Sequence, residues 1–88
     1  MNLERYFETR KIEETTQIGF IDFDLDIVPP KLFEYKNLKI LYLSHNNLKM
    51  LPPEFSNLIN LIYLSMAFNK FETLPNAVFN LTNLKTLN

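Results

Sequence analysis

Hydrophobic residues recur along this chain at a fixed interval of 23 positions. The sets that show the interval most clearly are Leu38, Leu61 and Leu84, and Leu41, Leu64 and Leu87. Prolines follow the same interval, at Pro29, Pro52 and Pro75. Such an interval predicts a chain built from repeated structural units that stack on one another.

Within each unit, the hydrophobic pattern is first that of a strand and then that of a turn. Leu41, Tyr42 and Leu43 alternate like a short β-strand whose leucines face the core and whose tyrosine faces outward. The segment 64–66 repeats this alternation, so the strands of successive units should lie side by side in a parallel sheet. Each Leu-Pro step removes a backbone donor and fixes φ, which predicts an extended or short 3₁₀ return segment.

The unit can be written L-x-x-L-x-L-x-x-N-x-L-x-x-L-P-x-x-F-x-x-L, and residues 38–58 are its best copy. This pattern resembles the leucine-rich repeat family, in its 23-residue intracellular form with a Leu-Pro step. The resemblance implies an α/β solenoid, an arc with short parallel β-strands on its concave face and an extended or 3₁₀ convex side. It also implies a protein-protein interaction module that binds a partner protein on the concave face.

Two regions are expected along the chain. Residues 1–14 are predicted to form an N-terminal capping helix, because Leu3, Tyr6 and Phe7 have helical spacing with charged residues around them. Its apolar face should cover the first repeat. Residues 15–88 then contain about three leucine-rich repeats and a truncated fourth.

Two asparagines are candidates for a structural role in the turns. Asn46 and Asn69 occupy the same column of successive units, where the chain leaves the sheet. A side-chain amide has donors and an acceptor, so it can satisfy backbone groups of its own turn and of the neighbouring turn. We therefore expect an asparagine ladder. The first unit departs from the pattern, since Phe23 stands in that column.

The outward-facing strand and turn residues form the candidate partner-binding surface. They are rich in aromatic side chains, which offer the large, rigid contact area found in binding hot spots. The alternative is that aromatics on adjacent strands only stack on each other and stabilise the sheet. The candidate residues are Ile40, Tyr42, Ser44, His45, Tyr63, Ser65 and Phe68.

The C-terminal end lacks a recognisable cap after the fourth strand. The far side of the third unit is expected to expose Phe71, Leu74, Val78 and Leu81. An exposed apolar end with an unpaired strand edge invites association. We therefore expect either a fragment of a longer array or self-association through the uncapped end.

The amino-acid composition excludes several kinds of functional site and disfavours some partners. The 88 residues include no cysteine and one glycine, which excludes a disulfide scaffold, a cysteine nucleophile and a glycine-rich phosphate loop. The net charge of −1 disfavours nucleic acid as a partner. There is no apolar run long enough for a secretory leader or a membrane span, so we expect no membrane association and a cytoplasmic location.

No catalytic, cofactor-binding or metal-binding residue is predicted, and the chain is not expected to be an enzyme. His45, the single histidine, lacks a matched nucleophile and acid. The segment 22–26 resembles the start of a calcium loop, but Ile27 and Phe33 stand where glycine and glutamate are needed. Two alternatives to the interaction module remain open. One is the targeting segment of a larger signalling enzyme (phosphatase, kinase, adenylyl cyclase or GTPase-like), and the other is a self-associating structural fragment.

Overall fold

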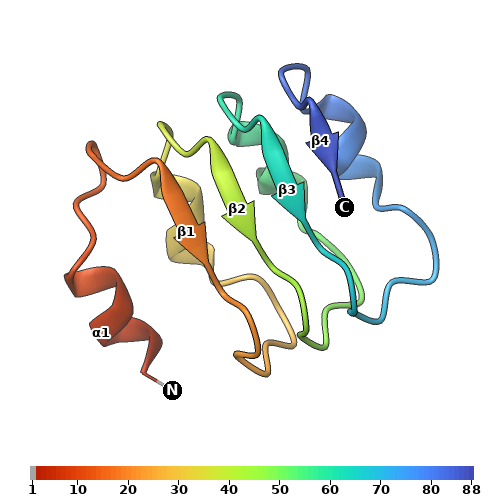
Figure 1. The fold of residues 1–88 in the computed structure, drawn as a ribbon, viewed down its shortest axis with the longest axis horizontal. Helices are drawn as coiled ribbons and strands as arrows, with labels where there is room; N and C mark the ends of the chain where they lie inside the picture. Colours follow the sequence, from red (N-terminus) through yellow and green to blue (C-terminus); the bar gives the residue numbers. More distant parts are fainter. Residues whose placement is uncertain (1) are drawn as a thin grey trace.

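The computed structural model describes residues 2–88 and consists of a short helix followed by repeating strand and 3₁₀ segments (Figure 1). We number the repeats from residues 15–37, 38–60 and 61–83, and residues 84–88 begin a fourth. The elements in chain order, with η for a 3₁₀ helix, are α1 (Leu3–Glu8), β1 (Gln17–Gly19), η1 (Pro30–Glu34), β2 (Ile40–Tyr42), η2 (Pro53–Asn57), β3 (Tyr63–Ser65), η3 (Asn76–Asn80) and β4 (Thr86–Leu87).

The strands form one parallel sheet in the order β1-β2-β3-β4. Ile18 is the register partner of Leu41, which pairs in turn with Leu64, and Leu64 pairs with Leu87. Each of these partners is 23 residues from the next. The prediction that strands of successive units lie side by side is therefore confirmed.

The return segments behind the sheet are short 3₁₀ helices, as the Leu-Pro steps predict (Figure 1). Each helix follows a proline whose φ is fixed near the extended region, for example −71° at Pro52 and −60° at Pro75. A further proline at the start of η1 and η2, Pro30 and Pro53, has no backbone N–H to leave unpaired. The sequence therefore favours short 3₁₀ turns at these points.

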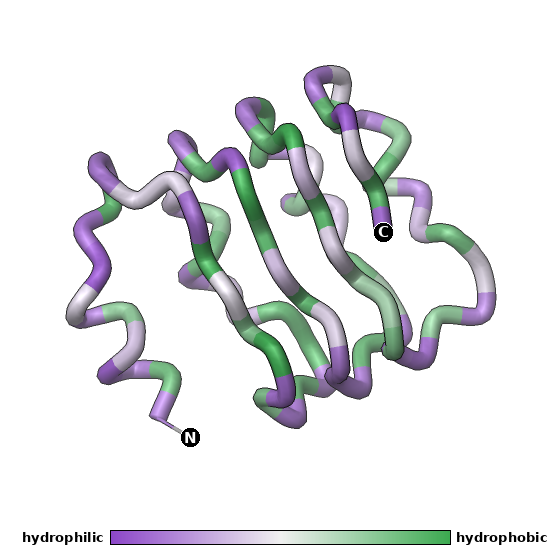
Figure 2. Tube along the Cα trace, in the orientation of Figure 1, coloured by the Kyte–Doolittle hydropathy of each residue, from purple (hydrophilic) through white to green (hydrophobic). Residues whose placement is uncertain are grey.

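The hydrophobic core lies between the sheet and the 3₁₀ helices. Leu41 and Leu64 point into it from the strands and are fully buried, and Phe55 closes it from η2 with no exposed surface. Figure 2 shows hydrophobic stretches along β2 and β3 and hydrophilic positions at the turns between repeats. The alternation of buried and outward side chains fixes which face of the sheet is open to solvent.

The helix α1 packs beside the first repeat. The Tyr6 ring contacts Phe20, with ring centroids 4.9 Å apart, and the Tyr6 hydroxyl accepts a hydrogen bond from the backbone N–H of Gly19 at 3.2 Å. Tyr35, in the first repeat, is fully buried and donates its hydroxyl hydrogen to the carbonyl of Arg10 at 3.0 Å. The segment before β1 thus covers buried aromatic rings. It also provides an acceptor for the backbone N–H of Gly19, on the edge of β1 that faces away from β2.

This helix is shorter than the sequence predicts, since it ends at Glu8 and does not extend to residue 14. The hydroxyl of Thr9 donates to the carbonyl of Tyr6, and the N–H of Arg10 donates to the carbonyl of Phe7. A threonine that bonds locally in this way competes with helix continuation. Residues 11–15 form a separate turn that leads into the sheet.

The third repeat is better covered than the sequence suggests. Val78 and Leu81 were expected to be exposed, but they are only 6% and 5% exposed and belong to the core. The reason is that η3 packs against η2, which turns these two side chains inward. Phe71 is half-buried, and Leu74 is exposed, as expected.

Candidate functional site

The face of the sheet that points away from η1, η2 and η3 presents the predicted partner-binding residues. We call this surface the open face, and on the second and third repeats it comprises Ile40, Tyr42, Ser44, His45, Tyr63, Ser65 and Phe68. Alternation along each strand places these residues opposite the buried leucines. Figure 1 shows that no helix covers β2 or β3 from this side.

Two tyrosines form the centre of the open face. The rings of Tyr42 on β2 and Tyr63 on β3 lie 5.5 Å apart at 54°, and both side chains are half-buried. Tyr42 also lies beside Gly19 of β1, where an added Cβ would be 3.7 Å from its ring. The tyrosine pair therefore spans neighbouring strands and offers apolar rings to solvent.

Ser65 contributes little to this surface, because it is only 5% exposed. It is the register partner of Tyr42 and shares the open face with Tyr63, two residues earlier on the same strand. A short hydroxymethyl side chain between larger neighbours does not reach solvent. Ile40 and Ser44 are half-buried like the two tyrosines, so His45 and Phe68 are the exposed members of the set.

His45 and Phe68 stack on each other at the turn that follows the strands. Their rings are 4.4 Å apart and inclined by 9°, and Phe68 is 74% exposed. Both residues have left-handed backbones, with φ of 59° and 58°. For L-residues this conformation costs about 1–2 kcal/mol, and it is unusual for a bulky side chain.

The left-handed conformation has a local cause in the repeat. Asp22, His45 and Phe68 occupy one column, each 23 residues from the next, and all have positive φ. The chain must reverse here to leave the sheet. Because no glycine is available at these turns, other residues take the strained conformation.

The asparagine that follows in the second repeat joins two turns. The Oδ1 of Asn46 accepts hydrogen bonds from the N–H groups of Phe23 and Leu25 in the preceding repeat, at 3.1 and 3.0 Å. Its Nδ2 donates to the carbonyl of Phe20 at 2.6 Å and to that of Leu43 at 3.0 Å. A buried amide thus satisfies backbone groups on both turns.

Asn69 repeats this arrangement one unit later. Its Oδ1 accepts from the N–H of Leu48 at 3.0 Å, and its Nδ2 donates to the carbonyls of Leu43 and Met66 at 2.8 and 3.1 Å. These bonds fix the turn that positions Phe68. The asparagines therefore hold the backbone on which the exposed aromatic stack is built.

Sequence reasoning missed a second asparagine column on the other side of each strand. Asn37, Asn60 and Asn83 are spaced by 23 residues, and each donates an Nδ2 hydrogen to a backbone carbonyl. The acceptors of Asn60 and Asn83 lie in the preceding repeat, and that of Asn37 is Glu13 in the N-terminal segment. The donor-acceptor distances are 2.8, 2.9 and 2.8 Å. Their identical spacing was the signal that could have revealed them.

The acidic segment of the first repeat adopts a turn. Asp22 and Asp24 are exposed and have positive φ, and Asp24 accepts a hydrogen bond from the side chain of Asn47. Among residues 2–88, no three His, Cys, Asp or Glu side chains come together as a metal site. No helix in this part of the chain is long and apolar enough to cross a bilayer.

Parallel strands, 3₁₀ returns and bonded asparagine turns together define a protein made of stacked repeats. A family model described as leucine rich repeat matches residues 36–88, which is more than half of the chain. The chain belongs to the leucine-rich repeat family. No curated protein matches the sequence. Domains of this family are commonly protein-protein interaction modules and are typically not enzymes.

Proposed function

We propose that this chain binds a partner protein through its open face, which would be the concave side of a solenoid arc. The observation that supports this most directly is the stack of His45 on Phe68. Large aromatic side chains are enriched in the few residues that dominate the energy of protein interfaces. Phe68 presents such a ring largely to solvent, since the residue is 74% exposed.

The choice of phenylalanine at a strained backbone position also supports a binding role for Phe68. Phe68 has a φ of 58° and lies outside the core, so its ring contributes little burial energy to compensate for the strain. Asp22, His45 and Phe68 all have positive φ in this column, so the strain comes from the turn and the choice of residue is what needs a reason. Asparagine tolerates this conformation better than phenylalanine does, so the turn itself does not demand an aromatic residue.

Tyr42 and Tyr63 would extend the same surface along β2 and β3. Aromatic pairs on adjacent strands also stabilise sheets, so their presence alone does not distinguish binding from stability. The two roles predict different results on substitution. A residue that binds a partner lowers affinity when it is removed, whereas a residue that only stabilises the sheet lowers the free energy of unfolding.

We also propose the finer assignment to the 23-residue intracellular type with a Leu-Pro step, acting in the cytoplasm. The near-neutral net charge of −1 and the apolar open face favour protein over nucleic acid or membrane as the partner. A targeting segment of a larger signalling enzyme would use the same open face. The variants below therefore test the binding surface that both hypotheses share.

The test uses the 88-residue chain as immobilised bait in a cytoplasmic extract. The double variant His45→Asn/Phe68→Asn removes both rings and keeps a residue that tolerates positive φ. We expect it to bind the captured partner at least about tenfold more weakly than the unchanged chain. The matched control is Phe79→Asn, which removes a ring that is 69% exposed on η3, away from the open face.

The control should retain full affinity, and denaturation should show that both variants are folded. Equal affinity of the double variant and the unchanged chain would contradict the assignment of the open face. A comparable loss in Phe79→Asn would place binding on another surface.

Self-association is a second candidate, favoured by the exposed side chain of Leu87 on the edge strand β4. Leu87 is 39% exposed, and β4 pairs with β3 on one side. Sedimentation of the chain over a range of concentrations should then show association, and Leu87→Lys should abolish it because edge charges oppose strand pairing. A chain that remains monomeric at high concentration would exclude this candidate.

A further inference from the structure

We propose a second binding site on the opposite side of the molecule, where a groove between the first two repeats takes an apolar peptide segment carrying one basic side chain. The groove encloses about 510 Å³. Small-molecule binding sites commonly span roughly 300–1,000 Å³, so the groove has room for side chains of a bound segment. The residues that line the groove include Ile27, Pro30, Phe33, Met50, Pro52 and Glu54.

The groove exposes side chains that a soluble fold would normally bury. Ile27 is 66% exposed and Met50 is 64% exposed, although both flank residues of the core. Phe33 forms part of the wall, and its ring meets the buried ring of Phe55 edge to face at 6.1 Å. An exposed apolar surface of this kind, built on a rigid base, is typical of an interaction site.

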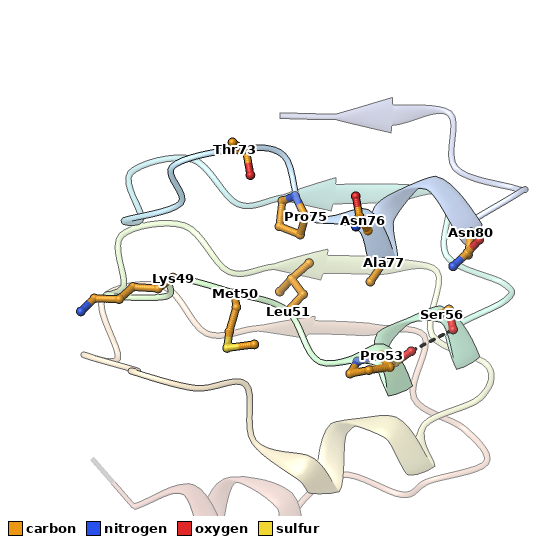
Figure 3. Close-up of a pocket in the computed structure, with 10 residues that line it drawn as sticks. All are labelled: Lys49, Met50, Leu51, Pro53, Ser56, Thr73, Pro75, Asn76, Ala77 and Asn80. Atoms are coloured by element: carbon orange, nitrogen blue, oxygen red, sulfur yellow. Dashed lines mark hydrogen bonds between the residues drawn. The ribbon is translucent and has the colours of Figure 1, made fainter.

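The next groove along the array shows that the repeat does not require this apolar lining. Figure 3 shows the equivalent groove between the second and third repeats, of about 410 Å³. Moving 23 residues along the chain replaces Phe33 by Ser56 and Met50 by Thr73, whereas Ile27 is replaced by Met50, which lines both grooves. Two of the positions thus accept small polar side chains, so packing of the repeat does not explain Phe33 and Met50 in the first groove.

Charge identifies the chemistry of the occupant. Glu54 is the charged residue that lines the first groove, and no ion pair within residues 2–88 uses it. The nearby carboxylate of Glu34 is already paired with Lys31, at 3.2 Å. A free carboxylate beside apolar walls favours a partner segment with an arginine or lysine next to its apolar residues. In the next groove the position of Glu54 is taken by Ala77.

The prolines of the groove indicate how the segment would be held. Pro30 and Pro52 have no backbone N–H, so they cannot pair with a peptide as an added strand would. Recognition therefore depends on side chains that enter the groove and on the charge of Glu54. This site is independent of the open face, which lies on the other side of the sheet.

Methionine methyl groups provide a direct reporter of occupancy. Met50 lines this groove and also the next one, so its methyl group reports binding on this side of the molecule and the Phe33 variant below assigns it to the first groove. Met66 is 8% exposed in the core and serves as the reference. The probes are acetylated octapeptides that carry leucine or phenylalanine at three positions and one arginine, whose position varies from peptide to peptide. Each has a matched control peptide with norleucine in place of the arginine. In the chain labelled with ¹³C-methyl methionine, we expect saturable shifts of the Met50 methyl resonance and unchanged Met66. The arginine peptides should bind at least about fivefold more tightly than their norleucine partners.

Equivalent positions in other repeats indicate which substitutions the fold tolerates and provide a matched control. Phe33→Ser introduces the residue found at Ser56, whose hydroxyl donates to the carbonyl of Pro53 at 2.9 Å (Figure 3). In the variant, the new hydroxyl can donate to the carbonyl of Pro30, which is the equivalent of Pro53. We expect Phe33→Ser to weaken peptide binding at least about tenfold. The control is Phe79→Ser in the same column of the third repeat, which should leave peptide affinity unchanged.

Further variants make the test decisive. Glu54→Ala should remove the preference for arginine and leave binding of the norleucine peptides unchanged. Met50→Thr removes the reporter methyl group, so its peptide affinity is measured by calorimetry, and it should be weakened even if Phe33→Ser is poorly folded. His45→Asn/Phe68→Asn should leave peptide binding unchanged, so failure of the groove and failure of the open face are distinguishable.

Several results would overturn the proposal. These are an unshifted Met50 methyl with every peptide, equal losses in Phe33→Ser and Phe79→Ser, and equal affinities for arginine and norleucine peptides. Shifts of the Met50 methyl that depend on protein concentration without peptide would assign the groove to a second copy of the chain instead.

Discussion

The two ends of the repeat array bury the same columns to different extents. Leu41 and Leu64 are fully buried in the middle of the sheet, whereas Leu87, in the same column of β4, is 39% exposed. Val28 is 3% exposed near the N-terminal end, and Leu74 in its column is 42% exposed. Residues of one column therefore acquire different environments according to their neighbours.

The N-terminal end differs because the segment before β1 packs against it. Tyr6 lies against Phe20 and accepts the outward N–H of Gly19, while Tyr35 is fully buried and bonded to the carbonyl of Arg10. In repeat proteins, stability is approximately a sum of terms within repeats and between neighbouring repeats. The comparison teaches that the stabilisation a repeat residue provides depends on how far the neighbouring units cover it.

The largest expected effect distinguishes the middle of the sheet from its C-terminal edge. Leu64→Ala should lower the free energy of unfolding by about 2–5 kcal/mol, because it opens a cavity in a fully buried site. Leu87→Ala should lower it by less than about 1 kcal/mol, because little contact is lost at an exposed site. Urea denaturation measures both values, and equal values would contradict the comparison.

The asparagine turns should show the next largest effect. Asn46→Ala leaves the N–H groups of Phe23 and Leu25 and the carbonyl of Phe20 without their partner, which should cost about 1–3 kcal/mol. Asn69→Ala should cost less, because Asn69 is half-buried and accepts from one N–H group where Asn46 accepts from two. Urea denaturation of both variants measures the two losses in free energy of unfolding. A larger loss for Asn69→Ala than for Asn46→Ala would contradict this prediction.

A smaller effect should follow loss of one hydroxyl at the N-terminal edge. Tyr6→Phe keeps the ring contact with Phe20 and removes the acceptor for Gly19, at a cost of about 0.5–1.5 kcal/mol. Hydrogen exchange at the Gly19 amide should become faster. Tyr63→Phe on the open face is the control and should leave that exchange rate unchanged.

The smallest effect concerns alkaline pH. Burial of Tyr35 raises the pKa of its hydroxyl above the ordinary value of 10.0. The folded state then holds this proton more tightly than the unfolded state, so the contribution to stability is complete below pH 10 and is lost as pH rises through the folded pKa. Tyr35→Phe should show a weaker decline of the unfolding midpoint over that range. An identical decline in both proteins would exclude a role for Tyr35.

Much of the fold could be predicted from the sequence because one interval governs it. The 23-residue spacing specified adjacent parallel strands, and the Leu-Pro steps specified the 3₁₀ returns. The end of α1 could not be predicted from spacing, because it depends on a local hydrogen bond from Thr9. The burial of Val78 depends on how η3 packs, which the third repeat alone does not reveal.

The candidate site was less predictable than the fold. The columns placed His45 and Phe68 near each other, but the stacked geometry and the positive φ follow from turns that no glycine marks. The burial of Ser65 depends on the size of its neighbours on the sheet.

Cross-saturation NMR on the complex with the captured partner tests the central proposal most directly. Saturation from the unlabelled partner should attenuate the signals of Tyr42, His45 and Phe68 and leave the ring of Phe79 on η3 unaffected. Attenuation at Phe79 with unchanged signals from Tyr42, His45 and Phe68 would contradict binding at the open face.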